Sequence, residues 1–309
     1  MIKSVTIIGS GRWSKQYIST LLRNKLTKKI VLISKKNLIG IKKWTINNKF
    51  QKYVSIKKAI NKKENNIAIV TNLASDHYKY TNLLIKKRYN VLVEKPLALN
   101  FSDAKKIYEN SKKSNVYVAY SNVFLFTSYI KKFSKLITKN KLKNIGFVWH
   151  DKFGDVRYGE KIRRDKKISL CFDIFPHIFS ILSYFKPLRN KNNFKIFKKL
   201  ISNNNSAHIK FKLNDFNCTC NIKKDAKKRI RIIYAKNSNL NLQIDFTDEN
   251  SIVLKKNNKI TNRINHKGKK PLYKMISKFL SSMITKNYDK RIDLKSGVYA
   301  IKLIEKILK

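Results

Sequence analysis

The stretch VTIIGSGRWS, residues 5–14, decides how the first part of this chain folds. Val5 to Ile8 form a short apolar strand, and a loop with two glycines follows it directly. Gly9 allows a tight turn after the strand, and Gly11 lets the backbone come close to a pyrophosphate. Because ligands of open parallel sheets bind outside the carboxyl ends of the strands, this loop predicts a phosphate-binding edge.

Apolar strands and helical patterns alternate over residues 1–118. Ser102 is the expected N-cap of one of these helices. Strands that are joined by helices predict a parallel sheet with right-handed crossovers. We expect strands at about 3–8, 30–34, 67–71, 90–94 and 116–120, and helices at about 14–24, 75–87 and 102–114.

The pattern changes beyond residue 144, where short strand-like runs follow one another. Apolar and polar residues alternate in several runs, as at Ile230, Ile232 and Tyr234, which is typical of an antiparallel sheet with one solvated face. We therefore expect two domains, at residues 1–120 and 121–309. The expected strands are at about 145–150, 194–200, 206–213, 216–223, 228–235 and 239–246, with helices at about 123–140, 172–184, 272–286 and 294–308.

The charge of the chain is extreme, because 70 Lys and Arg stand against 18 Asp and Glu, a net +52. Clustered cations would indicate nucleic acid or an anionic membrane. Here the lysines are spread evenly, with no basic tail and no nucleic-acid motif. We therefore predict no specific nucleic-acid partner, and a preference for anionic small substrates. A nucleic-acid binder remains an alternative that binding at physiological salt would favour.

Three cysteines, Cys171, Cys218 and Cys220, lack the spacing of a metal site, so no metal is predicted. The most apolar stretch, residues 168–185, contains Asp173, Pro176 and His177 and makes a poor membrane span. We expect no secretory signal before the first strand. We expect a soluble, cytoplasmic protein with no membrane partner.

The end of the second expected strand bears on the choice of dinucleotide. An acidic residue there would bind the 2′-hydroxyl of NAD, whereas basic groups accommodate the 2′-phosphate of NADP. This chain has Ser34, Lys35 and Lys36 at that place and no acid. The sequence predicts NADP as the preferred cofactor, with NAD as the alternative.

Three further motifs carry polar groups. The loop TNLASDH, residues 71–77, follows the third strand and can line the nicotinamide side of the crevice. The pair Glu94-Lys95 ends a buried strand, and Pro96 follows it. Asp173 and His177 stand at i and i+4 and share one face of a helix, where a carboxylate beside an imidazole suits proton transfer. Such a pair in an apolar helix can also be purely structural.

Taken together and in this order, GSGRWS, the Thr71–His77 loop, Glu94-Lys95-Pro96 and Asp173…His177 resemble the Gfo/Idh/MocA oxidoreductases. The resemblance implies an α/β fold. Residues 1–120 would be a doubly wound, parallel Rossmann domain, and residues 121–309 a substrate-binding and oligomerisation domain on an open, mostly antiparallel sheet. Ser14 replaces the family's usual third small residue.

The resemblance also implies roles for individual residues. Lys95 would polarise the substrate oxygen, His177 would accept its proton, and Asp173 would orient His177 or bind substrate. It further implies a homo-oligomer, either a dimer or a tetramer. The expected cofactor-binding residues are Gly9, Gly11, Arg12, Trp13, Ser34, Lys35, Thr71, Asn72, His77, Glu94 and Lys95.

The sequence therefore predicts an NAD(P)-dependent oxidoreductase that transfers a hydride between nicotinamide and a CH–OH or keto group of a sugar, polyol or nucleotide sugar. Two alternatives remain open. One is a catalytically idle NAD(P)-binding sensor, and the other is a reductase of a non-sugar substrate such as an imine or a tetrapyrrole.

Overall fold

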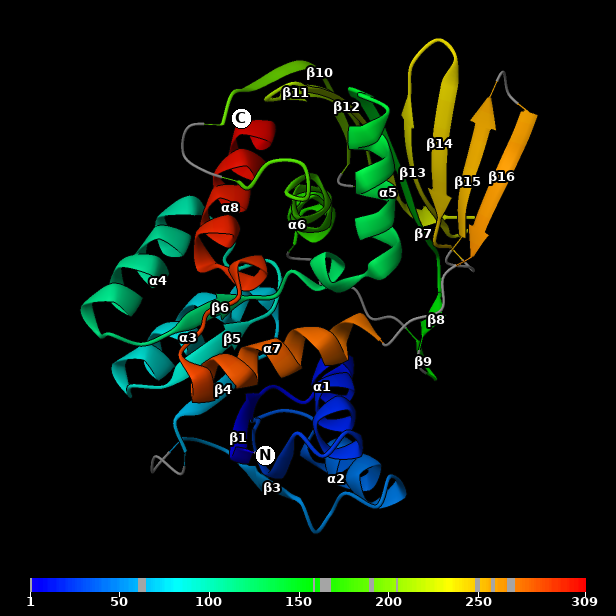
Figure 1. Cartoon of the computed structure of the whole chain (residues 1–309). Helices are drawn as coiled ribbons and strands as arrows, with labels where there is room; N and C mark the ends of the chain where they lie inside the picture. Colours follow the sequence, from blue (N-terminus) through cyan, green and yellow to red (C-terminus); the bar gives the residue numbers. More distant parts are fainter. Residues whose placement is uncertain are drawn as a thin grey trace. The chain divides into compact units, whose positions relative to one another are not determined.

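The computed structural model describes residues 2–60, 65–157, 159–161, 168–188, 192–203, 205–247, 251–256, 259–265 and 270–309. It divides the chain into two compact units, Met1–Val123 with Lys270–Ile301 and Phe124–Lys269 with Lys302–Lys309 (Figure 1). Among the helices of these ranges, none has the length and hydropathy needed to cross a membrane.

The first unit is built on a six-stranded sheet with the strand order β3-β2-β1-β4-β5-β6, and every pairing in it is parallel. Four helices connect these strands, and α7 and the first part of α8 complete the unit. The elements are β1 (Ile2–Ile8), α1 (Arg12–Arg23), β2 (Thr27–Ile33), α2 (Leu38–Asn47), β3 (Val54–Lys57), β4 (Ile67–Val70), α3 (His77–Lys86), β5 (Asn90–Val93), α4 (Phe101–Lys113), β6 (Val118–Tyr120), α7 (Pro271–Thr285) and α8 (Leu294–Leu308).

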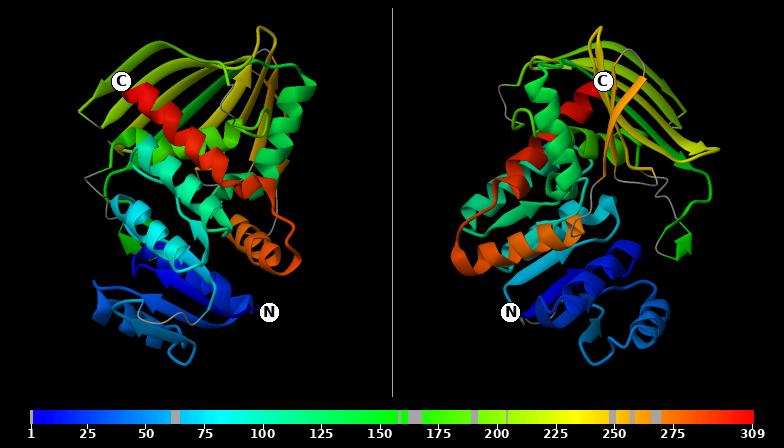
Figure 2. Two further views of the ribbon diagram at one scale, coloured as in Figure 1. Left: turned by 90° about the vertical axis from the view of Figure 1, so that its left-hand side faces the viewer. Right: turned by 45° about the vertical axis from the view of Figure 1, so that its right-hand side comes forward.

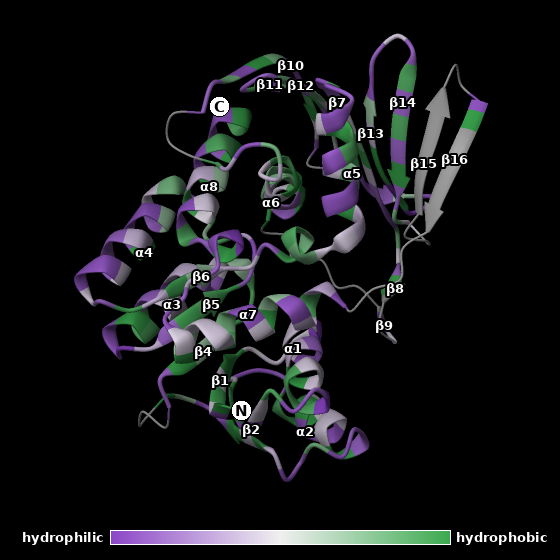
Figure 3. Cartoon of the chain, in the orientation of Figure 1, coloured by the Kyte–Doolittle hydropathy of each residue, from purple (hydrophilic) through white to green (hydrophobic). Residues whose placement is uncertain are grey.

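This strand order confirms the predicted doubly wound parallel sheet. The chain runs outward from β1 to β3, returns to the centre, and then continues from β4 to β6. Right-handed crossovers therefore place α1 and α2 on one face and α3 and α4 on the other. The central strands are buried on both faces, because the successive residues Ile69 and Val70 of β4, and Leu92 and Val93 of β5, have no exposed surface. Figure 3 shows the apolar character of these strands.

Residues 270–301 pack with the first unit, although the sequence suggested a division at residue 120. Helix α7 lies against α1, and Phe279 of α7 stacks on Tyr117 with ring centroids 6.0 Å apart. Asp293 forms an isolated bridge with Ala119 of β6. The apolar side of a helix needs an apolar partner, and sequence position alone does not identify that partner.

Two local predictions in this unit need correction. Asn100, and not Ser102, is the N-cap of α4, because its side chain accepts a hydrogen bond of 2.7 Å from the Asp103 N–H. In addition, α2 and β3 were not predicted from the sequence. Helix α2 buries only Ile41 and Thr45, so its apolar periodicity is weak.

The second unit is built on an eight-stranded sheet with the order β10-β11-β12-β7-β13-β14-β15-β16. All its pairings are antiparallel except that of β12 with β7, so the predicted mostly antiparallel sheet is confirmed. Its elements are α5 (Ser128–Lys139), β7 (Asn144–Lys152), β8 (Val156–Arg157), β9 (Glu160–Lys161), α6 (Leu170–Leu182), β10 (Phe194–Ser202), β11 (Ser206–Leu213), β12 (Phe216–Ala226), β13 (Ile230–Lys236), β14 (Leu240–Asp245), β15 (Ser251–Lys256) and β16 (Lys259–Asn265).

Helices α5 and α6 cover one face of this sheet, with α5 packed on β14 and β15 and α6 packed on β11 (Figure 2). Phe175 and Phe179 of α6 meet Phe211 of β11, and all three side chains are fully buried. The strands β15 and β16 were not predicted from the sequence.

In β13, the buried positions are the reverse of those that the alternation of apolar and polar residues suggests most simply. Ile230, Ile232 and Tyr234 are only half-buried, whereas the intervening Arg231 and Ile233 are buried. A charged residue therefore occupies an inward position of the strand. Its ionic and aromatic partners, which a sequence pattern cannot show, make this orientation possible.

Gly9 ends β1 in a conformation that only glycine adopts readily, with a φ of +120°. A Cβ atom there would lie 2.9 Å from the backbone nitrogen of Asn72, so glycine lets the loops after β1 and β4 touch. Gly11, the N-cap of α1, has an ordinary φ of −79°, and a Cβ on it would meet nothing within 4 Å.

We therefore expect Gly9→Ala to lower the free energy of unfolding by about 1–3 kcal/mol, the usual cost of a strained backbone conformation. Gly11→Ser is the control and should stay within about 0.5 kcal/mol of the unsubstituted protein, because serine is at least as good an N-cap as glycine and a Cβ fits at this position. Urea denaturation of both variants measures the difference. Equal stability of the two would show that the loop contact at Gly9 is not a constraint.

Candidate functional site

The carboxyl ends of the parallel strands meet at the point where the strand order reverses, between β1 and β4. This is the place where open α/β sheets bind ligands. The glycine loop follows β1, and the Thr71–His77 loop follows β4. The predicted residues Gly9, Gly11, Thr71 and Asn72 are therefore brought together at one edge. Arg12 and Trp13 lie beside them, half-buried in the first turn of α1.

Ser14 explains how the chain manages without a third glycine in this loop. Its side chain is fully buried, and its hydroxyl lies 2.9 Å from the Thr71 hydroxyl. Thr71 in turn donates to the Ile8 carbonyl at 3.1 Å. A hydrogen bond thus joins α1 to the end of β4, where a third glycine would have permitted close packing alone.

Asn72 presents an amide group to this edge. Within the part of the chain that the structure describes, neither its Oδ1 nor its Nδ2 has a hydrogen-bond partner, although both atoms are buried. Buried amide groups are normally paired, because leaving one unpaired costs free energy. An unpaired amide at a ligand-binding edge is the feature expected of a group that binds a ligand.

His77 connects two loops. Its Nδ1 lies 2.6 Å from the Pro96 carbonyl oxygen and its Nε2 lies 3.2 Å from that of Asn72. Burial lowers the pKa of His77, so the ring is neutral near pH 7 and donates to one carbonyl only. We assign the donated hydrogen bond to the shorter contact, that between Nδ1 and the Pro96 carbonyl oxygen. Because His77 is only 1% exposed, the structure places it as a support for the two loops.

Glu94 lies at the end of β5 and is 7% exposed. Its carboxylate accepts hydrogen bonds from the Tyr17 hydroxyl at 2.5 Å, the Ser121 hydroxyl at 2.9 Å and the Lys95 N–H at 3.0 Å. Burial and the charge of Glu94 raise the pKa of Tyr17, which keeps its hydroxyl a donor. This network fixes the turn that carries Lys95, whose side chain is half-buried.

The loop after β2 contains the predicted Ser34 and Lys35. The Ser34 hydroxyl is buried and lies 2.7 Å from the Lys36 carbonyl oxygen and 2.8 Å from the Ser10 hydroxyl. Ser34 therefore shapes the loop from within, whereas Lys35 and Lys36 are exposed.

Helix α6 carries the predicted pair of the second unit. Eleven of its thirteen residues are buried, and the two that are only half-buried are Asp173 and His177. The Ser169 side chain caps the helix by accepting from the Phe172 N–H at 3.3 Å. The pair thus forms the single polar stripe of an otherwise apolar helix, as the i, i+4 spacing predicted.

The imidazole of His177 lies among aromatic rings. The ring of Trp149 stacks on it at 5.5 Å with an interplanar angle of 18°, and the edge of Phe124 approaches at 4.9 Å. Trp149, Tyr17 and Ser121 were not predicted from the sequence. Trp149 stands at an inward position of its strand, but nothing in the spacing connects it with His177.

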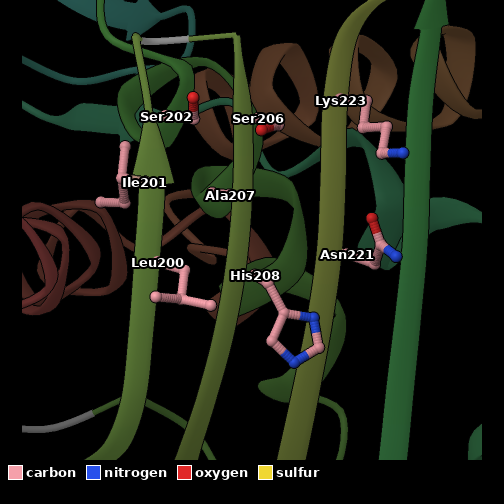
Figure 4. A pocket seen from close by; sticks show the side chains of 8 residues that line it. All are labelled: Leu200, Ile201, Ser202, Ser206, Ala207, His208, Asn221 and Lys223. Atoms are coloured by element: carbon pink, nitrogen blue, oxygen red, sulfur yellow. The ribbon is translucent and has the colours of Figure 1, made fainter.

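A hollow of about 420 Å³ lies on β10, β11 and β12, with none of the predicted site residues in its lining (Figure 4). The side chains around it include His208, Asn221 and Lys223. Asn221 also contacts the ring of His150 at 3.2 Å. Within the described ranges, no group of three or more His, Cys, Asp and Glu side chains could hold a metal ion.

The chain is similar in fold to several solved structures. UDP-N-acetylglucosamine 3-dehydrogenase GnnA from Acidithiobacillus ferrooxidans matches 99% of this chain and 97% of its own, at 10% identity and a TM-score of 0.75. KijD10, a 3-ketoreductase from Actinomadura kijaniata in complex with NADP and TDP-benzene, matches 99% and 96% at 11% identity and a TM-score of 0.81. The dehydrogenase MviM from Clostridium difficile matches 99% and 98% at 14% identity and a TM-score of 0.73.

No curated protein sequence matches the chain. Residues 3–121 match the family model of the Gfo/Idh/MocA oxidoreductases, described as an oxidoreductase family with an NAD-binding Rossmann fold. The strand order of the first unit and its glycine loop agree with that match. The amino-terminal part of this protein, residues 3–121, therefore belongs to the Gfo/Idh/MocA oxidoreductase family and is its NAD-binding Rossmann domain.

Proposed function

We propose that the protein is an NADP-dependent oxidoreductase that interconverts a CH–OH group and a keto group on a sugar, a polyol or, most specifically, a nucleotide-linked sugar. The observation that carries this proposal is the polar stripe of α6. Asp173 and His177 are its two half-buried residues, and their chemistry suits proton transfer at a hydroxyl oxygen.

The names of the structural neighbours support the same chemistry. One is a UDP-N-acetylglucosamine 3-dehydrogenase, and another is a 3-ketoreductase bound to NADP and TDP-benzene. Both names describe the interconversion of a hydroxyl and a keto group. Because the identities are 10% and 11%, these neighbours suggest a substrate class and do not assign it.

Two features of the first unit fit a bound dinucleotide. The space above Gly11 is open, since a Cβ there would meet nothing within 4 Å. The buried amide of Asn72 is available for a ligand. We propose that the glycine loop, with Arg12 and Trp13, holds the pyrophosphate and that Asn72 contacts the nicotinamide half. Thr71, His77 and Glu94 would hold the surrounding loops in place.

When bound, the nicotinamide would supply the hydride donor or acceptor. The chain itself would manage the proton and the charge on the substrate oxygen. His177 would accept the hydroxyl proton during oxidation and return it during reduction. Asp173 would orient the imidazole or bind substrate, and the ammonium group of Lys95 would stabilise negative charge on the oxygen.

We expect His177→Gln to lower kcat by at least about 10²-fold, because it removes the proton acceptor. The affinity for NADPH should not change. His208→Gln is the matched control, since His208 lies at the hollow on β10, β11 and β12. The assay follows NADP⁺ reduction with UDP-N-acetylglucosamine, and then with other UDP- and TDP-linked sugars. Undiminished turnover by His177→Gln would refute this role, and NADPH binding without any turnover would favour the idle-sensor alternative.

We propose that Lys35 and Lys36 bind the 2′-phosphate of NADP, because the Ser34 hydroxyl is already engaged within the loop. Lys35→Glu should weaken NADPH binding by about 10–100-fold, the effect of losing a hydrogen bond to a charged group. NADH binding should be unchanged or stronger. Nucleotide fluorescence measures both affinities at physiological salt. Lys28→Glu is the control for the change of charge, as Lys28 is an exposed lysine near the other end of β2. An equal loss of affinity for NADPH and for NADH would contradict the proposal.

We propose that the protein forms a homo-oligomer, a dimer or a tetramer, through the face of the eight-stranded sheet opposite α5 and α6. Apolar side chains persist on that face, among them the half-buried Val148 and Ile232 and the 57% exposed Leu200. Ile232→Lys should reduce the mass measured by light scattering to that of a monomer, and Lys113→Ser, at an exposed position of α4 in the first unit, should not. If the unsubstituted protein itself has the mass of a monomer, the proposed interface is excluded.

We propose the cytoplasm as the location of the protein. Cys171, Cys218 and Cys220 are all buried free thiols, which is the state kept in a reducing compartment. Burial raises the pKa of Cys171 to about 12, so this thiol is unreactive at neutral pH.

A further inference from the structure

Arg231 is an exception in this chain. The sequence contains 70 Lys and Arg residues, yet among those whose burial the structure describes, Arg231 alone is buried, at 4% exposure. Removing a guanidinium from water is costly unless specific partners compensate for it. The partners of Arg231 therefore indicate what the burial achieves.

Three consecutive residues of β7 contact this guanidinium. Asp151 forms an ion pair with it, and the His150 carbonyl oxygen accepts a hydrogen bond of 3.2 Å. The guanidinium lies over the ring of Trp149, 4.1 Å from the centroid. Arg231 and Trp149 are direct partners in the antiparallel register of β13 and β7. The ion pair thus fixes the position of a flat cation on the indole.

The same indole stacks on the imidazole of His177, with centroids 5.5 Å apart and an interplanar angle of 18°. The two contacts reach Trp149 from different directions. Arg231 comes from β13, whereas α6, which carries His177, packs on β11 at the other side of β7 in the strand order. Phe124 and Phe246 contact the indole edgewise at 5.8 and 5.6 Å. The ring of Trp149 therefore has little freedom to turn.

We propose that Trp149 and Arg231 are positioning residues for His177. Asp151 and the His150 carbonyl anchor Arg231, Arg231 holds the indole, and the indole holds the imidazole in one orientation. This inference rests on the proposed function, because the orientation matters for catalysis only if His177 exchanges a proton with the substrate. Neither Trp149 nor Arg231 is expected to contact the reacting atoms.

The first experiment does not depend on turnover. Trp13→Phe and Trp44→Phe in this chain leave Trp149 as its single tryptophan, since the chain has three. A protonated imidazole stacked on an indole quenches its fluorescence, and histidine changes its charge between about pH 8 and pH 5. Fluorescence should therefore fall on acidification in this background, and His177→Gln should abolish the fall.

Arg231→Met should reduce that acid quenching by at least half, because the indole is no longer held against the imidazole. Arg229→Met is the matched control and should keep it, since Arg229 donates to the Thr247 carbonyl whereas Arg231 covers the indole. Arg231→Lys keeps the positive charge but loses the planar guanidinium. It replaces Arg231→Met in this test if that variant does not fold. Full quenching in Arg231→Lys or Arg231→Met would overturn the role of Arg231. Acid quenching that persists in His177→Gln would contradict the stacking of the His177 imidazole on Trp149.

The second experiment separates positioning from general stability. With a nucleotide sugar that the unsubstituted protein oxidises, Trp149→Leu should lower kcat by about 10²-fold, the effect of a small displacement of a catalytic group. KM for NADP⁺ should remain unchanged, and Trp149→Phe should restore most of kcat. Unchanged kcat in Trp149→Leu would overturn the inference. If no sugar is turned over, the proposed function fails, while the fluorescence still decides whether the imidazole is held.

Discussion

One constraint shapes the edge of the parallel sheet between β1 and β4. It is the close contact of two backbone segments, at Gly9 and Asn72. The loops after β1 and β4 touch because Gly9 lacks a Cβ. The Ser14–Thr71 hydrogen bond then ties α1 to the same place, and His77 links the loop after β4 to Pro96 after β5. Three strand ends are therefore joined by one backbone contact and by the side chains of Ser14, Thr71 and His77, and these links leave the Asn72 amide available for a ligand.

The second unit meets a different constraint, the burial of polar groups. Helix α6 is apolar on every side except for the stripe of Asp173 and His177. Opposite it, β7 and β13 bury a cation, Arg231, against Asp151 and Trp149. A buried ion pair is poor support for stability on its own. It has a clearer purpose as an anchor for an aromatic ring that contacts His177.

Among the side chains whose burial the structure describes, the charged groups of this protein of net charge +52 lie almost entirely at the surface. Where the structure describes burial, no lysine is buried, and the interior charges are the paired Glu94 and Arg231. Exposed lysines contribute little to stability through individual ion pairs. Their combined field would instead attract anions, which is compatible with the dinucleotide and nucleotide-sugar ligands that we propose.

Four features were predictable from the sequence alone: the parallel sheet, the glycine loop, the mostly antiparallel second sheet, and the i, i+4 placement of Asp173 and His177. These features follow from periodicity and from the special conformation of glycine, which are local properties of the chain. Three others are evident only in the folded protein: α7 packs with the first unit, Arg231 and not Ile232 is buried in β13, and Glu94 accepts hydrogen bonds from Tyr17 and Ser121. Those outcomes depend on partners far away in the sequence, because a buried charge or an apolar helix face is stable only beside a group that compensates it.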